Sequence, residues 1–379
     1  MIPFDIKLQL KILRLHIKNK GFGRITLFYL FIFLPFISMN YLFHQFFFFL
    51  DELLFFSYRS IETDRSMFII GPPRCGTSLF LDMLNKSSEI TSMRAWELIF
   101  APSICLKLFY RLMGKLDHLL GTPLTRAYIK LHRRQNEKLL KVHDTSLLHY
   151  EEDAMLFYHT GNAPFYLFVF PFVELIELFT HFDEFTSPKY KARYMKYYKR
   201  CIQKHLFVFG RRKTYLSKNP FFSLYVKTLR EHFDDAKFIY MIRTPYQVVP
   251  SAFSLATISD HWTRYADPEA YSNGIIEVLK QEYAYPLETL NFEDEKHNVM
   301  IQYEDLISNP QAMVEKIHDQ FKMHYSDELK RSLSETAKRK KKFVSKNKYS
   351  LDKYNLSESQ IKTHFKDIFS SLGFEKEGI

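Results

Sequence analysis

The stretch that most constrains the fold of this 379-residue chain is a glycine-rich turn between an apolar run and the start of a helix. Residues 67–70 (Met-Phe-Ile-Ile) are apolar, and residues 71–78 (Gly-Pro-Pro-Arg-Cys-Gly-Thr-Ser) follow directly. A strand that ends in such a turn and opens a helix directs several backbone N–H groups, and the positive end of the helix dipole, at one point. The sequence therefore predicts an anion-binding loop of the phosphate-binding kind at residues 71–78.

The loop differs from its nucleoside-triphosphate version at one position. That version, G-x-x-x-x-G-K-[ST], uses its lysine to bind the β- and γ-phosphates and its hydroxyl to hold Mg²⁺. Here Thr77 follows Gly76 where the lysine would stand, and the cation is Arg74, inside the loop. A guanidinium binds an oxyanion through two parallel hydrogen bonds. This arrangement favours a phosphosulfate or a nucleotide monophosphate over ATP.

A second strand-then-helix pattern is predicted at residues 237–251. Arg243 stands at the carboxyl end of its strand, and Ser251 lies eight residues further on. Open α/β sheets bind ligands at this edge, so we expect Arg243 and the loop at residues 71–78 to converge on one crevice, where Ser251 offers a hydroxyl to a second phosphate. A kinase or another NTPase would more often have a metal-holding aspartate here. Such an enzyme, acting on a small molecule, is the alternative function.

These motifs resemble those of the sulfotransferases that use 3'-phosphoadenosine 5'-phosphosulfate (PAPS). The 5'-phosphosulfate loop of that family, P-[KR]-[ST]-G-T-[TS], is matched by residues 73–78, and its 3'-phosphate element by residues 243–251. Cys75 and Ser78 depart from the commoner residues but keep small side chains. Further landmarks of the bacterial-type branch are Trp96-Glu97 and residues 149–153, 217–220, 303–306 and 348–351.

The resemblance implies in-line transfer of a sulfuryl group from PAPS to a hydroxyl, without a metal. Arg74 and the N–H groups of residues 76–78 would stabilise the leaving phosphate, and Lys218 would bind the sulfuryl oxygens. No Cys/His pattern with zinc spacing is present in the sequence. The residues expected to bind the nucleotide are Arg74, Cys75, Gly76, Thr77, Ser78, Arg243, Ser251, Lys346 and Lys348.

Two residues are candidates for the base that takes the proton of the acceptor hydroxyl. Glu97 lies in the region where related enzymes have an active-site carboxylate, and it is the first candidate; a carboxylate in this role needs a raised pKa. His149 is the second, because an imidazole is the easier base at neutral pH. A structural ion pair is the alternative role for either residue.

The net charge of +11 comes from two short stretches. Residues 1–24 carry six Lys/Arg and one Asp, and residues 331–348 carry eight Lys/Arg and one Glu. The rest of the chain is close to neutral, so we do not expect a nucleic acid as a partner. A membrane surface is the expected partner of the first stretch.

The N-terminal residues predict membrane-associated helices. Lys7, Lys11, Arg14 and Lys18 recur at steps of four, three and four, which aligns them on one face of a helix with apolar neighbours, a pattern suited to an anionic lipid surface. Residues 25–50 contain no Asp, Glu, Lys or Arg. As one helix they would extend about 39 Å, enough to span a bilayer core of about 30 Å. Pro35 leaves a kinked or re-entrant hairpin as the alternative.

The expected fold is an α/β three-layer sandwich with a mostly parallel central sheet. Strands are predicted at residues 67–70, 214–217, 237–242 and 298–302, each followed by helices. Residues 303–305 are expected to cap or brace the site. Residues 1–58 are predicted to form the amphipathic helix and membrane anchor, and residues 59–379 the sulfotransferase domain, with a helical insertion at about 105–210.

The expected location is a membrane, with the catalytic domain on its cytoplasmic face. The alternative is a Golgi-type lumenal orientation, for which Asn85-Lys-Ser87 and Asn355-Leu-Ser357 are formal glycosylation sequons. Lipid, glycan, tyrosyl and small-molecule hydroxyls are all compatible acceptors. A non-catalytic membrane-surface protein that keeps the fold is disfavoured, because the expected anion ligands are present.

Overall fold

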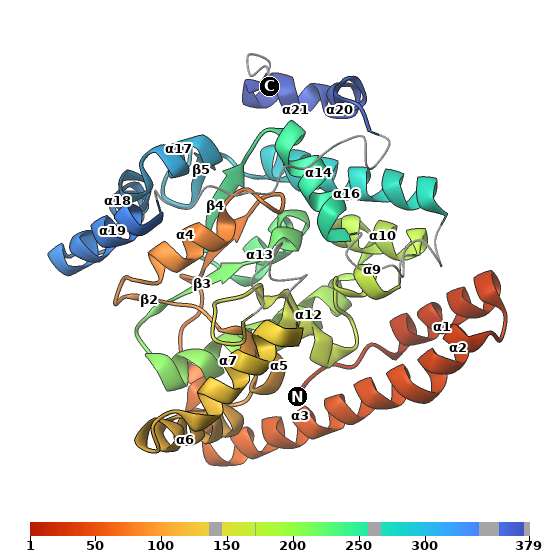
Figure 1. The fold of residues 1–379 in the computed structure, drawn as a ribbon, viewed down its shortest axis with the longest axis horizontal. Helices are drawn as coiled ribbons and strands as arrows, with labels where there is room; N and C mark the ends of the chain where they lie inside the picture. The colour runs from red at the N-terminus through yellow and green to blue at the C-terminus, as the bar shows by residue number, and fades with distance from the viewer. Residues whose placement is uncertain (136–145, 171, 257–266, 341–355, 375–379) are drawn as a thin grey trace. The chain divides into compact units, whose positions relative to one another are not determined.

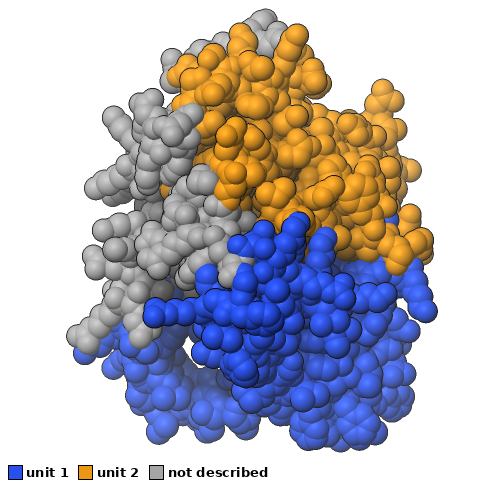
Figure 2. Space-filling view, turned by 90° about the vertical axis from the view of Figure 1, so that its right-hand side faces the viewer, with its two compact units in different colours: residues 1–63, 93–166, 189–212 blue, residues 64–92, 167–188, 213–379 orange. Residues whose placement is uncertain are grey.

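The structure is a computed structural model, and it describes residues 1–379 except 136–145, 171, 257–266, 341–355 and 375–379 (Figure 1). Lys346 and Lys348 therefore lie outside the described residues. The chain divides by its internal contacts into two compact units, which Figure 2 colours separately. Unit 1 comprises residues 1–63, 93–166 and 189–212, and unit 2 comprises residues 64–92, 167–188 and 213–379.

A five-stranded parallel sheet forms the centre of unit 2. Its strands run in the order β2-β3-β1-β4-β5, and every pair is parallel. They are β1 (Met67–Ile70), β2 (Ile90–Thr91), β3 (Thr214–Lys218), β4 (Lys237–Ile242) and β5 (Asn298–Gln302). Most of their residues are buried, which explains why these strands read as apolar runs in the sequence. The four predicted strands are confirmed, and the two-residue β2 was not predicted.

Helices of unit 2 pack against this sheet in two groups (Figure 1). In one group α4 contacts β1, β3 and α18; in the other, α16 contacts α13, α14 and the 3₁₀ helix Pro220–Leu224, which itself packs on β1. The α/β fold with a parallel central sheet is thereby confirmed. The helices are α4 (Thr77–Leu84), α10 (Val173–Thr180), α11 (Phe182–Phe185), α13 (Val226–His232), α14 (Pro245–Ala256), α16 (Pro268–Thr289), α17 (Tyr303–Ser308), α18 (Pro310–Gln320), α19 (Asp327–Lys340), α20 (Glu358–His364) and α21 (Lys366–Leu372).

The register of the sheet sets where the site lies. Ile69 of β1 is opposite Lys218 of β3, and Ile70 is opposite Tyr240 of β4. Because all strands run in the same direction, the chain leaves β1, β3 and β4 at one edge of the sheet. The loop after β1, the end of β3 and Arg243 after β4 therefore lie at the same edge.

Unit 1 is built from helices. They include α1 (Ile6–Lys20), α2 (Arg24–Phe28), α3 (Leu34–Leu54), α5 (Ala95–Phe100), α6 (Ile104–Leu119), α7 (Pro123–Gln135), the 3₁₀ helix Asp153–Thr160 and α12 (Pro188–Phe209); the short α9 (Tyr166–Val169) begins at its boundary. The N-terminal helices share this unit with residues 93–166 and 189–212. The predicted domain boundary at residue 58 stays a prediction.

One apolar helical run extends from Arg24 to Leu54, with a mean hydropathy of 1.8 over its most apolar window. Its length and composition suffice to cross a membrane. A π-helical turn, Tyr29–Phe33, joins α2 to α3, and the Leu34 N–H donates to the carbonyl of Tyr29. Such a turn accommodates Pro35, whose ring clashes with a regular helical turn. The run is continuous, and the chain instead reverses near Gly21, between α1 and α2 (Figure 1).

Replacing Gly71 by Ala tests the approach of the β1 loop to β4. Gly71 has a φ of +121°, and a Cβ placed there would lie 2.0 Å from the carbonyl oxygen of Met241. We expect Gly71→Ala to lower the free energy of unfolding by about 1–3 kcal/mol from backbone strain, with the clash adding to this loss. Urea denaturation followed by circular dichroism measures it.

Gly114→Ala is the matched control for that substitution. Gly114 lies inside α6, and a Cβ there would meet no atom within 4 Å. Alanine is favoured over glycine inside a helix by about 0.5–1 kcal/mol, so the control should be neutral or slightly stabilising. Equal effects of the two substitutions would show that the contact with Met241 does not constrain the loop.

Candidate active site

The loop between β1 and α4 has the geometry of an anion-binding turn. Gly76 adopts a left-handed conformation, with a φ of +81°, directly before α4. A Cβ on Gly76 would lie 3.0–3.2 Å from the side chains of Tyr303 and Leu306, so the turn packs closely on α17. The first N–H groups of α4 have no acceptor within the helix and carry its positive dipole end. The loop is thus preformed for an anion.

Three of the predicted residues meet at this loop. The Nε of Arg74 donates to the hydroxyl of Ser251 over 3.1 Å. Arg243 donates from Nη1 to the main-chain carbonyl of Arg74 over 3.2 Å. The structure therefore brings the loop after β1 together with Arg243 and α14.

Arg243 is held on an aromatic ring and keeps an unused donor. Its guanidinium carbon lies 3.9 Å from the centre of the Tyr303 ring, which is a cation–π contact. Its Nε is buried and has no hydrogen-bond partner among the described residues. An orphaned buried donor is costly unless a ligand satisfies it, so this atom fits a site for an anionic group. Tyr303 braces the site, as expected for residues 303–305.

Lys218 supplies a cation beside the start of α4. It is the last residue of β3 and is almost fully buried. Its Nζ donates to the hydroxyl of Ser78 over 3.2 Å. Because Ser78 is exposed in the first turn of α4, this contact holds the ammonium group of Lys218 next to the anion-binding turn.

Cys75 and Thr77 are buried at the same loop. Burial raises the pKa of the Cys75 thiol far above its usual range, and Glu282 and Glu304 add to this effect while Arg243 opposes it. The thiol is therefore protonated at neutral pH and unreactive as a nucleophile. Cys75 contributes a small packed side chain and its backbone to the loop.

Glu97, the first candidate for the base, is a member of a buried ion-pair cluster in unit 1. Its carboxylate accepts from Lys107 Nζ over 3.0 Å and contacts His205 Nδ1 over 2.7 Å, and it also accepts from the Arg94 N–H over 3.0 Å. Burial alone would raise its pKa, but Lys107 and His205 together lower it to about 2. A base needs the opposite shift, so this environment fits the structural alternative better than the catalytic role.

His149, the second candidate, is an exposed residue of unit 1. Its main-chain carbonyl accepts from the N–H of Ala95 over 2.9 Å, which links it to the start of α5. Both candidates for the base thus belong to unit 1, whereas the anion-binding loop belongs to unit 2.

Sequence reasoning missed two polar residues at the edge of the sheet. The hydroxyl of Ser223 accepts from the Gly71 N–H over 2.8 Å and so holds the start of the loop. Asn219 accepts from the Phe221 N–H through Oδ1, while its Nδ2 is buried without a partner among the described residues. Ser223 gave no signal, because a single serine in an apolar segment has no pattern. Asn219 stands in the 217–220 motif but was assigned no role.

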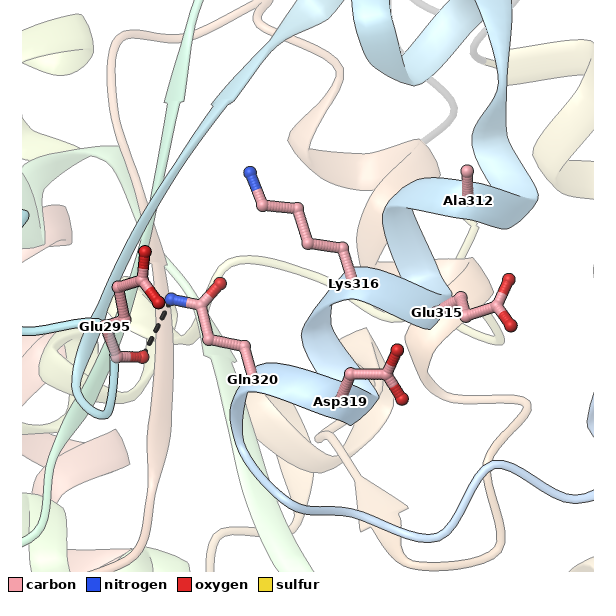
Figure 3. A pocket seen from close by; sticks show the side chains of 6 residues that line it. All are labelled: Glu295, Ala312, Glu315, Lys316, Asp319 and Gln320. Carbon is pink, nitrogen blue, oxygen red and sulfur yellow. Dashed lines mark hydrogen bonds between the residues drawn. The ribbon is translucent and has the colours of Figure 1, made fainter.

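A surface depression on unit 2 lies over α18 and is not part of this site (Figure 3). Three carboxylates line it, which disfavours a sulfated or phosphorylated ligand. Its lining residues are Glu295, Ala312, Glu315, Lys316, Asp319 and Gln320. Within the described parts of the chain, no group of three or more His, Cys, Asp or Glu side chains is placed to hold a metal ion.

The sheet and its loop define an α/β protein of the phosphate-loop class. The sequence profile of the sulfotransferase family matches residues 66–327, which is more than half of the chain. The chain belongs to that family, and it is an enzyme, a sulfotransferase. The alternative of a kinase or NTPase is not supported.

Relatives agree with this assignment. The chain is 24% identical over 343 residues to the omega-hydroxy-beta-dihydromenaquinone-9 sulfotransferase Stf3 of Mycobacterium bovis and of Mycobacterium tuberculosis, an alignment that covers 86% of this chain and 80% of each relative. Among solved structures, sulfotransferase STF1 of Mycobacterium tuberculosis has a TM-score of 0.68 at 17% identity, covering 95% of this chain and 92% of that one. Sulfotransferase STF9 of Mycobacterium avium has a TM-score of 0.66 at 16% identity, covering 84% and 80%. These two structures share the fold.

Replacing Glu97 by Gln separates its structural role from a catalytic one. The variant leaves the ammonium of Lys107 buried without its counter-charge, so we expect the free energy of unfolding to fall by about 3–5 kcal/mol. The pKa of Glu97 is lowered in the folded state, so its stabilisation is complete above its ordinary pKa of 4.5 and is lost as the pH falls toward 2. The stability difference between the native protein and Glu97→Gln should therefore shrink from pH 6 to pH 3 in urea titrations.

Glu184→Gln is the control for this measurement. Glu184 forms an exposed pair with His181, and its loss should change stability by less than about 1 kcal/mol. If Glu97→Gln kept its stability and lost only turnover, Glu97 would be the base.

Proposed function

We propose that this sulfotransferase moves a sulfuryl group from PAPS to the hydroxyl of a lipid-like acceptor at a membrane. The observation that carries the proposal is the meeting of Arg74, Ser251 and Arg243 at the anion-binding loop, with Lys218 beside it. These residues offer three cations and two hydroxyls, counting Ser78, at one edge of the sheet. PAPS has anionic groups at both ends of its ribose, and this set of donors suits both.

In this proposal the two ends of the donor bind to different residues. The N–H groups of residues 76–78 and the guanidinium of Arg74 bind the 5'-phosphosulfate. Arg243, with its orphaned buried Nε, and Ser251 bind the 3'-phosphate. Lys346 and Lys348, outside the described residues, remain predicted ligands of the same phosphate.

The chemistry is an in-line exchange at sulfur. A new bond forms between the acceptor oxygen and sulfur while the bond from sulfur to the bridging oxygen breaks, and the acceptor proton passes to a base. Lys218 compensates the charge of the sulfuryl oxygens, and Arg74 with the loop N–H groups compensates the charge on the leaving phosphate. His149 is the base that we propose, because the ion pairs of Glu97 keep that carboxylate from binding a proton.

The acceptor class follows from two observations. The relatives named above are sulfotransferases of a hydroxylated menaquinone, and the alignment covers most of their length. This chain also exposes a long apolar helix, of which only 17% of the most apolar window is buried. A hydroxylated lipid is therefore the acceptor that we favour over glycan, tyrosyl and small-molecule hydroxyls.

We place the catalytic domain on the cytoplasmic face of the membrane, where PAPS is a metabolite. Asn85, in one of the two formal sequons, supports this placement. Its Nδ2 donates to the Leu81 carbonyl over 2.9 Å and to the Ser92 hydroxyl over 2.8 Å. An amide engaged in two hydrogen bonds at the end of a helix is a poor acceptor for a glycan.

Removal of the Arg243 side chain tests the nucleotide site. Arg243→Ala should remove a charge-assisted contact worth about 1.5–3 kcal/mol. The affinity for adenosine 3',5'-bisphosphate should therefore fall by about tenfold or more. The affinity for adenosine 5'-monophosphate, which lacks the 3'-phosphate, should fall far less. Calorimetric binding to detergent-solubilised protein measures both constants. Arg331→Ala, an exposed arginine of α19, is the control. Equal weakening of the two nucleotides would reduce Arg243 to a structural role.

His149→Ala tests the base. We expect a loss of turnover of about 10²–10⁴-fold, the usual contribution of general base catalysis. Binding of adenosine 3',5'-bisphosphate should be unchanged, because His149 is outside the nucleotide loop. Sulfate transfer from labelled PAPS to a hydroxylated quinone in mixed micelles is the assay. His118→Ala, at the exposed end of α6, serves as the control. Unchanged turnover of His149→Ala would reject this residue as the base.

A further inference from the structure

The apolar helical run of residues 24–54 is fixed to unit 1 by buried polar contacts at its carboxyl end. Asp51 pairs with Lys204 of α12 at 2.7 Å, and both side chains are fully buried. The same carboxylate accepts from the N–H groups of Ile104 and Cys105, which begin α6. Next to it, Glu52 pairs with Arg200 at 2.6 Å. Breaking a buried ion pair of this kind by withdrawing one partner is strongly destabilising.

α1 and the run of residues 24–54 form a helical hairpin, and the start of this hairpin is held by the same unit. Asp5, directly before α1, accepts from Asn162 Nδ2 over 2.8 Å and from the Tyr190 hydroxyl over 2.7 Å. Between the two ends, Tyr29 donates to the carbonyl of Gln9 over 2.9 Å and joins the helical run to α1. Along the run, Phe33 packs on Tyr166 and His44 on His159, with ring centres 5.8 and 4.2 Å apart, and a helix that crossed a bilayer would lose these contacts.

The outward side of the run is nevertheless apolar. Its buried residues, Ile37, His44, Phe48 and Asp51, lie on one face of α3. The other face exposes large side chains: Phe31 is 74% exposed, and Phe36, Met39, Leu42, Phe46 and Leu53 are each more than half exposed. An exposed apolar face of this length marks an interaction surface.

α6, which packs against α3, also exposes apolar side chains. α6 buries polar side chains, Lys107 and Asp117, and exposes leucines. Leu119 and Leu120 at its end are 79% and 76% exposed, and Leu112 and Leu116 precede them. We name the exposed apolar side chains of α3 and α6 the apolar platform.

The charge around the apolar platform is positive. Residues 6–50 contain six Lys/Arg and no Asp or Glu. Lys7, Arg14 and Lys18 of α1 are exposed, as are Lys115 of α6 and Arg126 of α7. In residues 104–135, Asp117 is the one acidic residue, and its carboxylate accepts from the N–H groups of Leu124 and Thr125. Apolar side chains flanked by cations match a lipid leaflet with anionic headgroups.

We propose that the apolar platform is a monotopic docking surface for an anionic membrane, with α3 lying in the plane of one leaflet instead of spanning the bilayer. The apolar side chains enter the acyl region, and the cations of α1, α6 and α7 meet the headgroups. Both ends of the hairpin stay on the catalytic side. The inference deepens the proposed function, since it says how the enzyme meets a lipid acceptor, but its evidence is independent of the nucleotide site.

Flotation of the full-length protein with vesicles tests the surface. Vesicles with 30% phosphatidylserine should carry the protein at least tenfold better than pure phosphatidylcholine at low salt, and high salt should reduce this preference. The double substitution Leu119→Glu and Leu120→Glu should lower binding at least tenfold. Phe185→Glu, an equally drastic change on α11 of unit 2, is the matched control and should bind as the native protein does. Equal vesicle binding of the native protein and both variants would overturn the proposal. It would also be overturned if the double substitution changed only the self-association of the protein and not its vesicle binding.

Labelling with a membrane-impermeant maleimide then distinguishes a helix that lies in one leaflet from a helix that spans the bilayer. Phe22, at the turn between α1 and α2, is 71% exposed, and Ser308 at the end of α17 is also exposed. Phe22→Cys and Ser308→Cys, each combined with Cys105→Ala, are labelled in inverted membrane vesicles whose cytoplasmic face is outward. Labelling of both is the expected result. Labelling at residue 308 alone would show a spanning helix, and labelling of neither would place the enzyme on the opposite face; each overturns the proposal.

Binding of adenosine 3',5'-bisphosphate by the Leu119/Leu120 double variant completes the experiment. It should equal that of the native protein, because the side chains of Leu119 and Leu120 are exposed and are not part of the nucleotide loop. If no protein bound the bisphosphate while vesicle binding followed the pattern above, the proposed function would fail and the docking surface would stand.

Discussion

The site depends on the shared edge of the parallel strands, where Arg243 donates a hydrogen bond to the main-chain carbonyl of Arg74. This hydrogen bond joins the loop after β1 to the end of β4, and the guanidinium carbon of Arg243 lies 3.9 Å from the centre of the Tyr303 ring. Arg74 has a φ of +72°, an unfavourable conformation for a residue with a side chain. The hydrogen bonds that Arg74 makes with Ser251 and Arg243 offset part of this strain.

The central part of the fold and the meeting of Arg74 with Arg243 could be predicted because parallel strands follow two simple rules. Strands buried on both faces read as apolar runs, which located β1, β4 and β5, while β3 extends one residue beyond its prediction. Parallel strands also end at the same edge of the sheet, and this rule predicted that Arg74 and Arg243 lie close together. The contact of Ser223 with Gly71 could not be predicted, because it depends on the direction of one hydroxyl.

Unit 1 was harder to predict for the same physical reason, on a larger scale. Glu97 stands ten residues before Lys107 and 108 before His205, and no local pattern pairs residues so far apart in sequence. The sequence predicted Glu97 as a base, a role that needs a raised pKa. In the structure Lys107 and His205 lower its pKa instead. The continuity of residues 24–54 through Pro35 likewise depends on a π-helical turn, which no sequence pattern in the segment predicts.

The buried pair of Asp51 and Lys204 has a consequence for the order of folding during synthesis. The two residues are 153 positions apart, so the apolar helix is complete long before its partner on α12 exists. At a synthesis rate of about 5–20 residues per second, this gap amounts to about 8–30 s. During that interval the carboxylate of Asp51 lacks the partner that it has in the folded protein. The pair that holds the helix in the folded protein can therefore form only after α12 has emerged from the ribosome.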